Sequence, residues 1–249
     1  MKRQNNKRAL IWLTSATLAL LLIIGGCALY VSDYYSADLD AIQAFSTENN
    51  VTKTIVSEKI ITYGQSDSQL GFIFYPGGKV EHTSYEPLMM ELASDGVFCI
   101  LLKMPFNLAV LDVNAAEAVI DAYPDIDKWY IGGHSLGGSM AASYVAGNIE
   151  KFDGIVLLGS YSAADLSDST LDVLSLYGSE DLVLNREKYE KYKKNMPSDF
   201  SEIEIEGGCH AYFGMYGQQK GDGDATLSPD EQIRLSADHI SEFIFEGDS

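Results

Sequence analysis

A serine between glycines is the feature of this sequence that most directly suggests chemistry. Residues 131–138 read IGGHSLGG and follow the apolar stretch 129–131. Glycines on both sides of Ser135 allow a sharp strand-to-helix turn that a Cβ atom would obstruct. The pattern also fits an ordinary glycine loop. The small residues at 139–143, which let a helix pack close to a sheet, favour a nucleophile elbow with Ser135 as the nucleophile.

A nucleophilic serine needs a general base, and after an elbow the partners follow in the order Ser, then Asp or Glu, then His. His210 and His239 are the two histidines that follow Ser135. His239 lies in an amphipathic pattern near the C-terminus and is interpreted as a helix-surface residue. His210 follows the strand-like residues 201–206 through two glycines, which places it on a loop, so we predict His210 as the base.

The acid must orient the base, and the best placed carboxylate is Asp181. It follows the apolar run 172–177 directly and precedes a polar helical pattern that begins near Asn185. Glu180 and Asp172 are the rival acids, and a lone aspartate in such a loop often serves only as a turn or helix cap. We predict that Asp181 orients His210 and stabilises its imidazolium.

An oxyanion hole needs two preorganised backbone N–H groups. Leu136, directly after the nucleophile, is predicted to supply one. The loop FIFYPGGKV, after an earlier strand, is predicted to supply the other from Gly78, with Lys79 as the second choice. A plain Pro-Gly turn is the competing interpretation.

Two further segments are expected at the substrate site. The run KMPFNLAV at 103–110 follows a strand end, and the glycine- and aromatic-rich run 211–225 follows His210. Lys79, Phe106, Tyr212 and Phe213 are the predicted substrate-binding residues. An ordered surface loop over 211–225 is an equal alternative. Asp222 and Asp224 lack the further ligands of a calcium loop, so no metal or other cofactor is expected.

The order of the apolar runs predicts the fold class. Strands are expected at 71–75, 97–102, 128–131, 154–158 and 172–177, after an antiparallel hairpin at 51–63. Helical patterns alternate with these strands, the last beginning with a capping serine at 228. The sequence therefore predicts an α/β fold with a mostly parallel central sheet and helices on both faces. Residues 159–171 are too few for a large lid domain.

The N-terminal residues predict a membrane segment. Residues 1–8 hold four basic residues and are expected to stay in the cytoplasm, and residues 9–31 are uncharged and long enough to cross a bilayer. A signal peptide or a lipoprotein segment lipidated at Cys27 is the alternative. Residues 32–50 are interpreted as a juxtamembrane stem and 51–249 as the catalytic domain, located outside the cytoplasm.

Composition limits the class of protein and its partners. The 249 residues are 46% hydrophobic, enough for one sizeable core. A net charge of −19 disfavours nucleic acid as a partner. Three cysteines make no disulfide framework, although a bridge between Cys99 and Cys209 is conceivable. The oligomeric state is not predicted.

Four segments together carry a resemblance to a known family: YPGGKV, KMPFNLAV, GGHSLGG and GGCHAYFGMYGQQKGDGDA. From about Gly71 to Glu246 the chain resembles the α/β-hydrolase superfamily, and within it small bacterial membrane-anchored serine hydrolases related to dienelactone hydrolases. The resemblance implies the α/β-hydrolase fold, the triad named above and the two oxyanion donors. Dienelactone hydrolases proper use a cysteine at the elbow, so their reaction does not transfer. Cys209 stands where the subgroup has asparagine.

These observations predict a membrane-tethered serine hydrolase that cleaves small or exposed acyl esters through an acyl-enzyme. A catalytically idle binding module of the same fold is one alternative. A peptidase or acyltransferase with the same triad is another, because the triad does not specify which acceptor attacks the acyl-enzyme. Cys209 is not expected to act as a nucleophile, because adjacent residues of an extended loop point in different directions.

Overall fold

The computed structural model describes residues 2–47 and 51–246. The chain forms two compact units that meet in sequence between Tyr34 and Tyr35. The first unit is built on helix α1 (Lys2–Ser32). Its stretch Trp12–Ser32 has a mean hydropathy of 2.0 and is long and apolar enough to cross a membrane, a property that signal sequences share.

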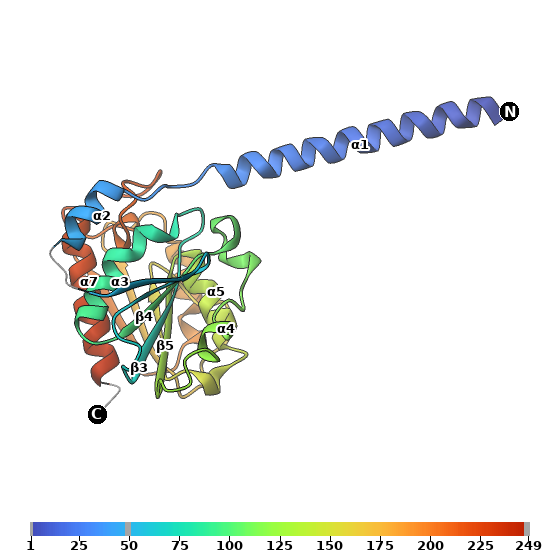
Figure 1. Ribbon diagram of the computed structural model, residues 1–249. Helices are drawn as coiled ribbons and strands as arrows, with labels where there is room; N and C mark the ends of the chain where they lie inside the picture. The colour runs from blue at the N-terminus through green and yellow to red at the C-terminus, as the bar shows by residue number, and fades with distance from the viewer. Residues whose placement is uncertain (1, 48–50, 247–249) are drawn as a thin grey trace. The chain divides into compact units, whose positions relative to one another are not determined.

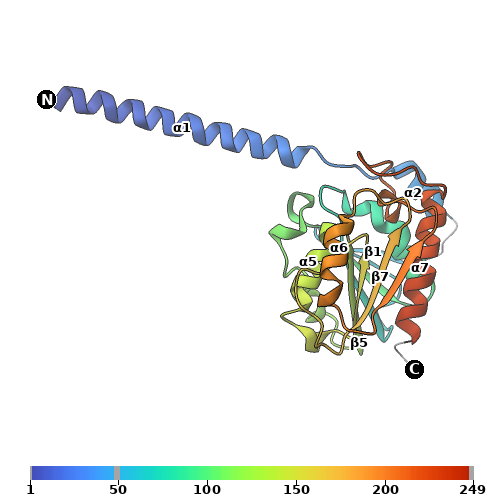
Figure 2. The same ribbon diagram turned by 180° about the vertical axis from the view of Figure 1, so that it is seen from behind.

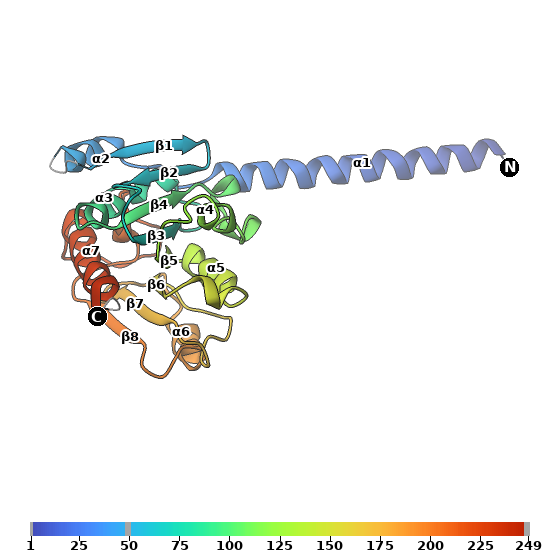
Figure 3. The ribbon, with the colours of Figure 1, turned by 60° about the horizontal axis from the view of Figure 1, so that its bottom comes forward.

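The second unit contains one sheet of eight described strands in the order β1-β2-β4-β3-β5-β6-β7-β8 (Figure 3). The hairpin β1–β2 is antiparallel and joins β4 in antiparallel fashion, whereas β4, β3, β5, β6, β7 and β8 run parallel. The strands are β1 (Lys53–Ser57), β2 (Ile60–Tyr63), β3 (Leu70–Tyr75), β4 (Phe98–Leu102), β5 (Lys128–His134), β6 (Gly154–Leu158), β7 (Asp172–Gly178) and β8 (Ser201–Ile205).

Helices cover both faces of the sheet, as Figure 3 shows. One face carries α3 (Glu86–Ser94) and α7 (Pro229–Glu246), and the other carries α4 (Glu117–Ile120), α5 (Leu136–Val145) and α6 (Arg186–Tyr192). All six residues of β3 are buried because alternate side chains enter two different cores. Phe72 and Phe74 enter the core beneath α3 and α7, and Ile73 and Tyr75 the core beneath α5.

The expected strands, hairpin and fold class are confirmed, and β5 runs further than predicted, to His134. The last helix begins as its capping pattern predicted, since Ser228 N–H donates to Glu231 Oε2 at 2.7 Å and Glu231 N–H donates to Ser228 Oγ at 3.3 Å. Residues 159–171, all described, contain no helix or strand, so no large lid is inserted there.

The predicted stem at 32–50 is not a separate segment, since its described residues from Tyr35 onward belong to the second compact unit. Helix α2 (Leu39–Ser46) buries Ile42 and Phe45 against the core that contains α3. Tyr35 forms a parallel bridge with Val80. The compact unit therefore begins at Tyr35 rather than at 51, because apolar side chains of the stem pack into the core that contains α3. Residues 48–50 lie outside the described part of the chain.

Parallel strands bring the predicted site together, because their carboxyl ends share one edge of the sheet, the upper edge in Figures 1 and 2. The loops that hold the predicted site residues all leave this edge. Gly78 follows β3, Phe106 follows β4, Ser135 follows β5, Asp181 follows β7 and His210 follows β8.

Candidate active site

Ser135 lies on a strained turn between β5 and α5. Its backbone has φ 53° and ψ −122°, a left-handed conformation that side-chain-bearing residues rarely adopt. Its N–H donates to Leu158 O at 2.9 Å, and its carbonyl accepts from Ser160 Oγ at 2.7 Å. A Cβ atom at Gly137 would overlap Tyr75 O, so only glycine allows the close approach. This is the geometry expected of a nucleophile elbow.

The predicted acid and base are in contact. His210 Nδ1 lies 2.8 Å from Asp181 Oδ2, and the two residues are 1% and 2% exposed. The second carboxylate oxygen, Oδ1, accepts from Val183 N–H at 2.9 Å and from Leu184 N–H at 2.8 Å. Two backbone donors therefore hold the Asp181 carboxylate in the orientation that meets the imidazole. The rivals Glu180, Asp172 and His239 make no such pair with one another or with His210 among the described contacts.

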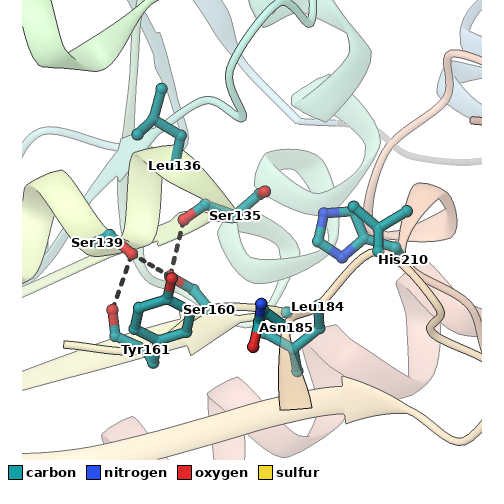
Figure 4. A pocket seen from close by; sticks show the side chains of 10 residues that line it. Ser135, Leu136, Ser139, Ser160, Tyr161, Leu184, Asn185 and His210 are labelled. Atoms are coloured by element: carbon teal, nitrogen blue, oxygen red, sulfur yellow. Dashed lines mark hydrogen bonds between the residues drawn. The ribbon is translucent and has the colours of Figure 1, made fainter. Parts of the chain in front are cut away.

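A pocket of about 230 Å³ joins the predicted nucleophile to the predicted base (Figure 4). Figure 4 shows the Ser135 side chain and the His210 imidazole extending toward each other. His210 Nε2 is buried and has no hydrogen-bond partner among the described residues, so it is available to a proton from the pocket. The lining residues are Ser135, Leu136, Ser139, Gly159, Ser160, Tyr161, Val183, Leu184, Asn185 and His210.

Hydrogen bonds in the turn after β3 distinguish between its two candidate oxyanion donors, Gly78 and Lys79. Lys79 N–H donates to Asn107 O at 2.7 Å, and Gly77 N–H donates to Tyr85 Oη at 3.1 Å. Gly78 N–H makes no hydrogen bond within the described chain. A Cβ atom on Gly78 would lie 2.9 Å from Leu136 Cδ2, so Gly78 sits directly against the other predicted donor. The geometry therefore favours Gly78 over Lys79.

The predicted substrate-binding residues are not among those that line this pocket. Phe106 is 64% exposed and points to solvent, whereas Phe213 is fully buried and packs on His134 with ring centroids 5.6 Å apart. Tyr212 is half-buried beside the core. All four residues follow strand ends at the carboxyl edge, as predicted, but position on a loop does not determine the direction of a side chain.

Two polar side chains, the buried Gln232 and the half-buried Asp222, support the loop that holds His210, and neither was predicted to have this role. Gln232 on α7 is fully buried, and its amide accepts from Cys209 N–H at 2.9 Å and donates to Cys209 O at 2.7 Å. Asp222 accepts from Ala211 N–H at 2.8 Å and from Leu182 N–H at 3.3 Å, which ties the base loop to the acid loop. A glutamine on the apolar face of α7 was the available signal for the first contact.

The residue before the nucleophile, His134, extends the buried site. Its ring lies 4.4 Å from the His210 ring between centroids, and its Nδ1 is hydrogen-bonded to Tyr85 Oη at 2.8 Å. Tyr85 Oη also accepts from Gly77 N–H. Burial, followed by the neighbouring His210, holds the pKa of His134 well below its usual range, so the His134 ring is neutral. His134 and Tyr85 thus connect the base to the oxyanion turn.

The cysteines are free. Cys99 and Cys209 are both buried and form no disulfide with each other. Burial raises the pKa of the Cys209 thiol to about 12, which keeps it protonated near neutral pH. Within the described chain, no group of three or more His, Cys, Asp or Glu side chains is arranged to hold a metal ion.

Comparison with known proteins agrees with this architecture. The model of the alpha/beta hydrolase family matches residues 71–234, well over half of the chain, so this protein belongs to the alpha/beta hydrolase family. Its fold is similar to the crystal structure of a predicted CIB-like hydrolase from Thermoplasma acidophilum, with a TM-score of 0.54 and 15% identity over 78% of this chain and 99% of that chain. At that identity the likeness shows the fold alone. No curated protein matches the sequence.

Proposed function

We propose that this hydrolase is a serine esterase in which Ser135, His210 and Asp181 form the catalytic triad. The observation that carries the proposal is the buried Asp181–His210 pair at 2.8 Å, whose imidazole faces a strained Ser135 across one pocket. The two N–H groups bind Oδ1 of the carboxylate and leave Oδ2 to the imidazole. A histidine that acts as a base in one fixed tautomer needs a carboxylate oriented in this way.

The first half-reaction forms an acyl-enzyme. Ser135 Oγ attacks the ester carbonyl carbon while His210 Nε2 takes the hydroxyl proton, and Asp181 stabilises the resulting imidazolium through Nδ1–H. Gly78 and Leu136 N–H groups donate to the oxyanion. The tetrahedral intermediate then expels the alcohol, which receives the proton from His210. Water repeats the sequence with His210 as base and releases the carboxylic acid and free Ser135.

The size of the pocket suits a small acyl group as the enclosed part of the substrate. Its volume of about 230 Å³ lies below the usual range for drug-sized ligands. Leu136, Val183 and Leu184 supply an apolar wall. The short connection over 159–171 leaves the mouth uncovered by a lid domain, which suits an ester whose remaining bulk stays outside.

We further propose that the N-terminal helix tethers the enzyme to a membrane with the catalytic unit outside the cytoplasm. Four basic residues precede the apolar stretch, and none of residues 32–51 is basic. Protease added to intact cells should degrade the catalytic unit, with a cytoplasmic protein as the intact control. Protection of the unit until the cells are lysed would reverse the orientation.

Active-site labelling tests the catalytic proposal. A fluorophosphonate should attach covalently to Ser135 of the full-length protein, and Ser135→Ala should abolish the adduct and lower kcat on short activated esters by about 10⁴ to 10⁶. Ser139→Ala is the matched control, because Ser139 lines the same pocket but donates its hydroxyl proton to Tyr161 O at 2.8 Å. A folded wild type with neither adduct nor turnover would favour a binding module instead.

A further inference from the structure

Four exposed apolar side chains lie on loops that leave the carboxyl edge of the sheet, the edge that holds the predicted site. Phe106, Val110 and Leu111 follow β4 and are 64%, 52% and 55% exposed, and Leu182 follows β7 and is 71% exposed. We call these four residues the apolar rim. In the sheet, β5 with its Ser135 turn lies between β4 and β7, so the rim has members on both sides of the predicted nucleophile. The segment after β4 lies along the upper edge in Figure 1.

The backbone holds Phe106 outward at an energetic cost. Phe106 and Asn107 have φ of 53° and 56°, a left-handed conformation that is unfavourable for residues with side chains. The neighbours Met104 and Ala109 are buried at 2% and 0% exposure, so the segment is anchored at both ends. Lys79 N–H, donating to Asn107 O, ties it to the oxyanion turn. Strain of this kind persists where the surrounding structure holds it in place, and it clusters at functional sites.

The chain enters the catalytic unit beside this segment. Tyr35 N–H donates to Lys79 O at 2.8 Å, and Glu81 N–H donates to Tyr35 O at 2.9 Å. Asp33 and Tyr34 are the two residues between Tyr35 and the end of α1 at Ser32. The apolar helix of membrane-spanning length therefore ends three residues before Tyr35, which is hydrogen-bonded to the turn that holds Asn107. This connection selects a lipid surface, rather than a second protein, as the occupant of the rim.

We propose that the apolar rim docks on a lipid bilayer, so that the pocket receives acyl esters presented at the membrane surface. The contact is apolar rather than electrostatic, because a chain with net charge −19 is repelled by anionic headgroups. Rim side chains enter the boundary between headgroups and acyl chains. The substrate class rests on the proposed esterase activity, whereas the docking rests on the proposed membrane tether and not on esterase activity.

Tryptophan fluorescence in vesicles tests the docking. The full-length protein carrying Trp12→Phe is placed in phosphatidylcholine vesicles, with or without brominated acyl chains, and compared with the same protein carrying Phe106→Trp. Ile55→Trp is the matched control, since Ile55 is 72% exposed on β1 and outside the rim. We expect about twofold quenching of the signal added by Phe106→Trp, as for a side chain about 5–10 Å deep, and none of the signal added by Ile55→Trp. Equal quenching at both positions, or at neither, would overturn the docking.

A ratio of two rates tests whether the docking delivers lipid-borne esters to the pocket. The rate on a phospholipid-borne ester in the vesicles is divided by the rate on a water-soluble ester of the same short acyl group. Val110→Ser/Leu111→Ser should lower this ratio about tenfold through lost apolar contact, and the control Ile55→Ser/Val56→Ser should leave it unchanged. If neither ester were turned over but the fluorescence of the Phe106→Trp variant were quenched, the esterase assignment would fail and the docking would stand. An unchanged ratio in the rim variant, with turnover intact, would reject lipid-borne esters as the substrate class.

Discussion

The predicted nucleophile elbow at Ser135 and the two loops that hold the predicted acid Asp181 and base His210, here called the acid–base loops, meet at one pocket. They are held by different physical means. The elbow depends on glycines, which have no side chain. Gly133 and Gly137 bring the turn against the end of β3, where a Cβ atom on either glycine would overlap Tyr75 O. Its strain at Ser135 is sustained by close backbone packing.

The acid–base loops depend instead on side chains that are present. Asp181, Gln232 and Asp222 together satisfy backbone N–H groups in both loops. Two of these three residues are remote in sequence from the group they position. Disruption of the elbow should therefore act through steric overlap, and disruption of the acid–base loops through lost hydrogen bonds, with smaller and graded effects.

The largest effect should come from a side chain placed in the elbow. Gly137→Val would overlap Tyr75 O, so we expect a loss of stability of about 3 kcal/mol or more, and no fluorophosphonate adduct. Urea unfolding and labelling measure the two. Gly147→Ala is the control after the same helix, where the nearest contact of a Cβ atom is an ordinary 3.7 Å. A stable, labelled Gly137→Val protein would contradict the steric account.

The second largest effect is expected when Asp181 loses its negative charge. Asp181→Asn retains the size of the side chain but no longer stabilises the protonated imidazole, and kcat should fall by about 10⁴. Steady-state kinetics on a short activated ester measures this loss. Glu180→Gln, the neighbouring rival, should keep most activity. An equal loss in both variants would move the acid role to Glu180.

Removal of the hydrogen bonds between Gln232 and Cys209 should lower activity less than the change at Asp181. Gln232→Leu leaves the Cys209 N–H and C=O without their partners, which should destabilise the fold by about 1–3 kcal/mol. A displaced His210 should lower kcat by about 10- to 100-fold. The exposed Gln218, changed to Leu, should alter neither quantity. A destabilised protein with unchanged kcat would show that Gln232 supports the fold but not the base.

A smaller effect is expected where the two regions are connected. Tyr85→Phe removes the hydroxyl shared by Gly77 N–H and His134 Nδ1, and kcat should fall about threefold to tenfold through the oxyanion turn. Tyr130→Phe is the control, because that buried hydroxyl donates to Ile244 O on α7. If both variants lost stability but neither lost activity, the connection would be structural only.

The smallest effect is expected at Cys209. Cys209→Ser should stay within about twofold of wild-type kcat, because the thiol is not required for the proposed chemistry. Its pKa of about 12 should also protect the wild type from iodoacetamide at pH 8, measured as residual activity with time. A loss comparable with Ser135→Ala would overturn the triad proposed above.

Much of the fold was predictable from local patterns. Apolar runs separated by helical spacing located β3 to β7, because both faces of these strands are covered, and the alternating pattern at 201–206 located the edge strand β8. The N-terminal boundary was missed, since Ile42 and Phe45 give too short a periodic pattern to reveal that α2 is buried. Their burial depends on a groove beside α3 that only the assembled sheet provides.

Short stretches of sequence were sufficient to locate the sharp turn at Ser135 and to predict the order of the triad residues and the glycine of the oxyanion turn. These depend on backbone geometry that a few consecutive residues impose. Three-dimensional packing was needed to establish that Gln232 and Asp222 support the base loop, that Phe213 faces the core and that Phe106 faces solvent. The direction of a loop side chain and the partners of a buried polar group depend on contacts between elements distant in the chain, which no local pattern records.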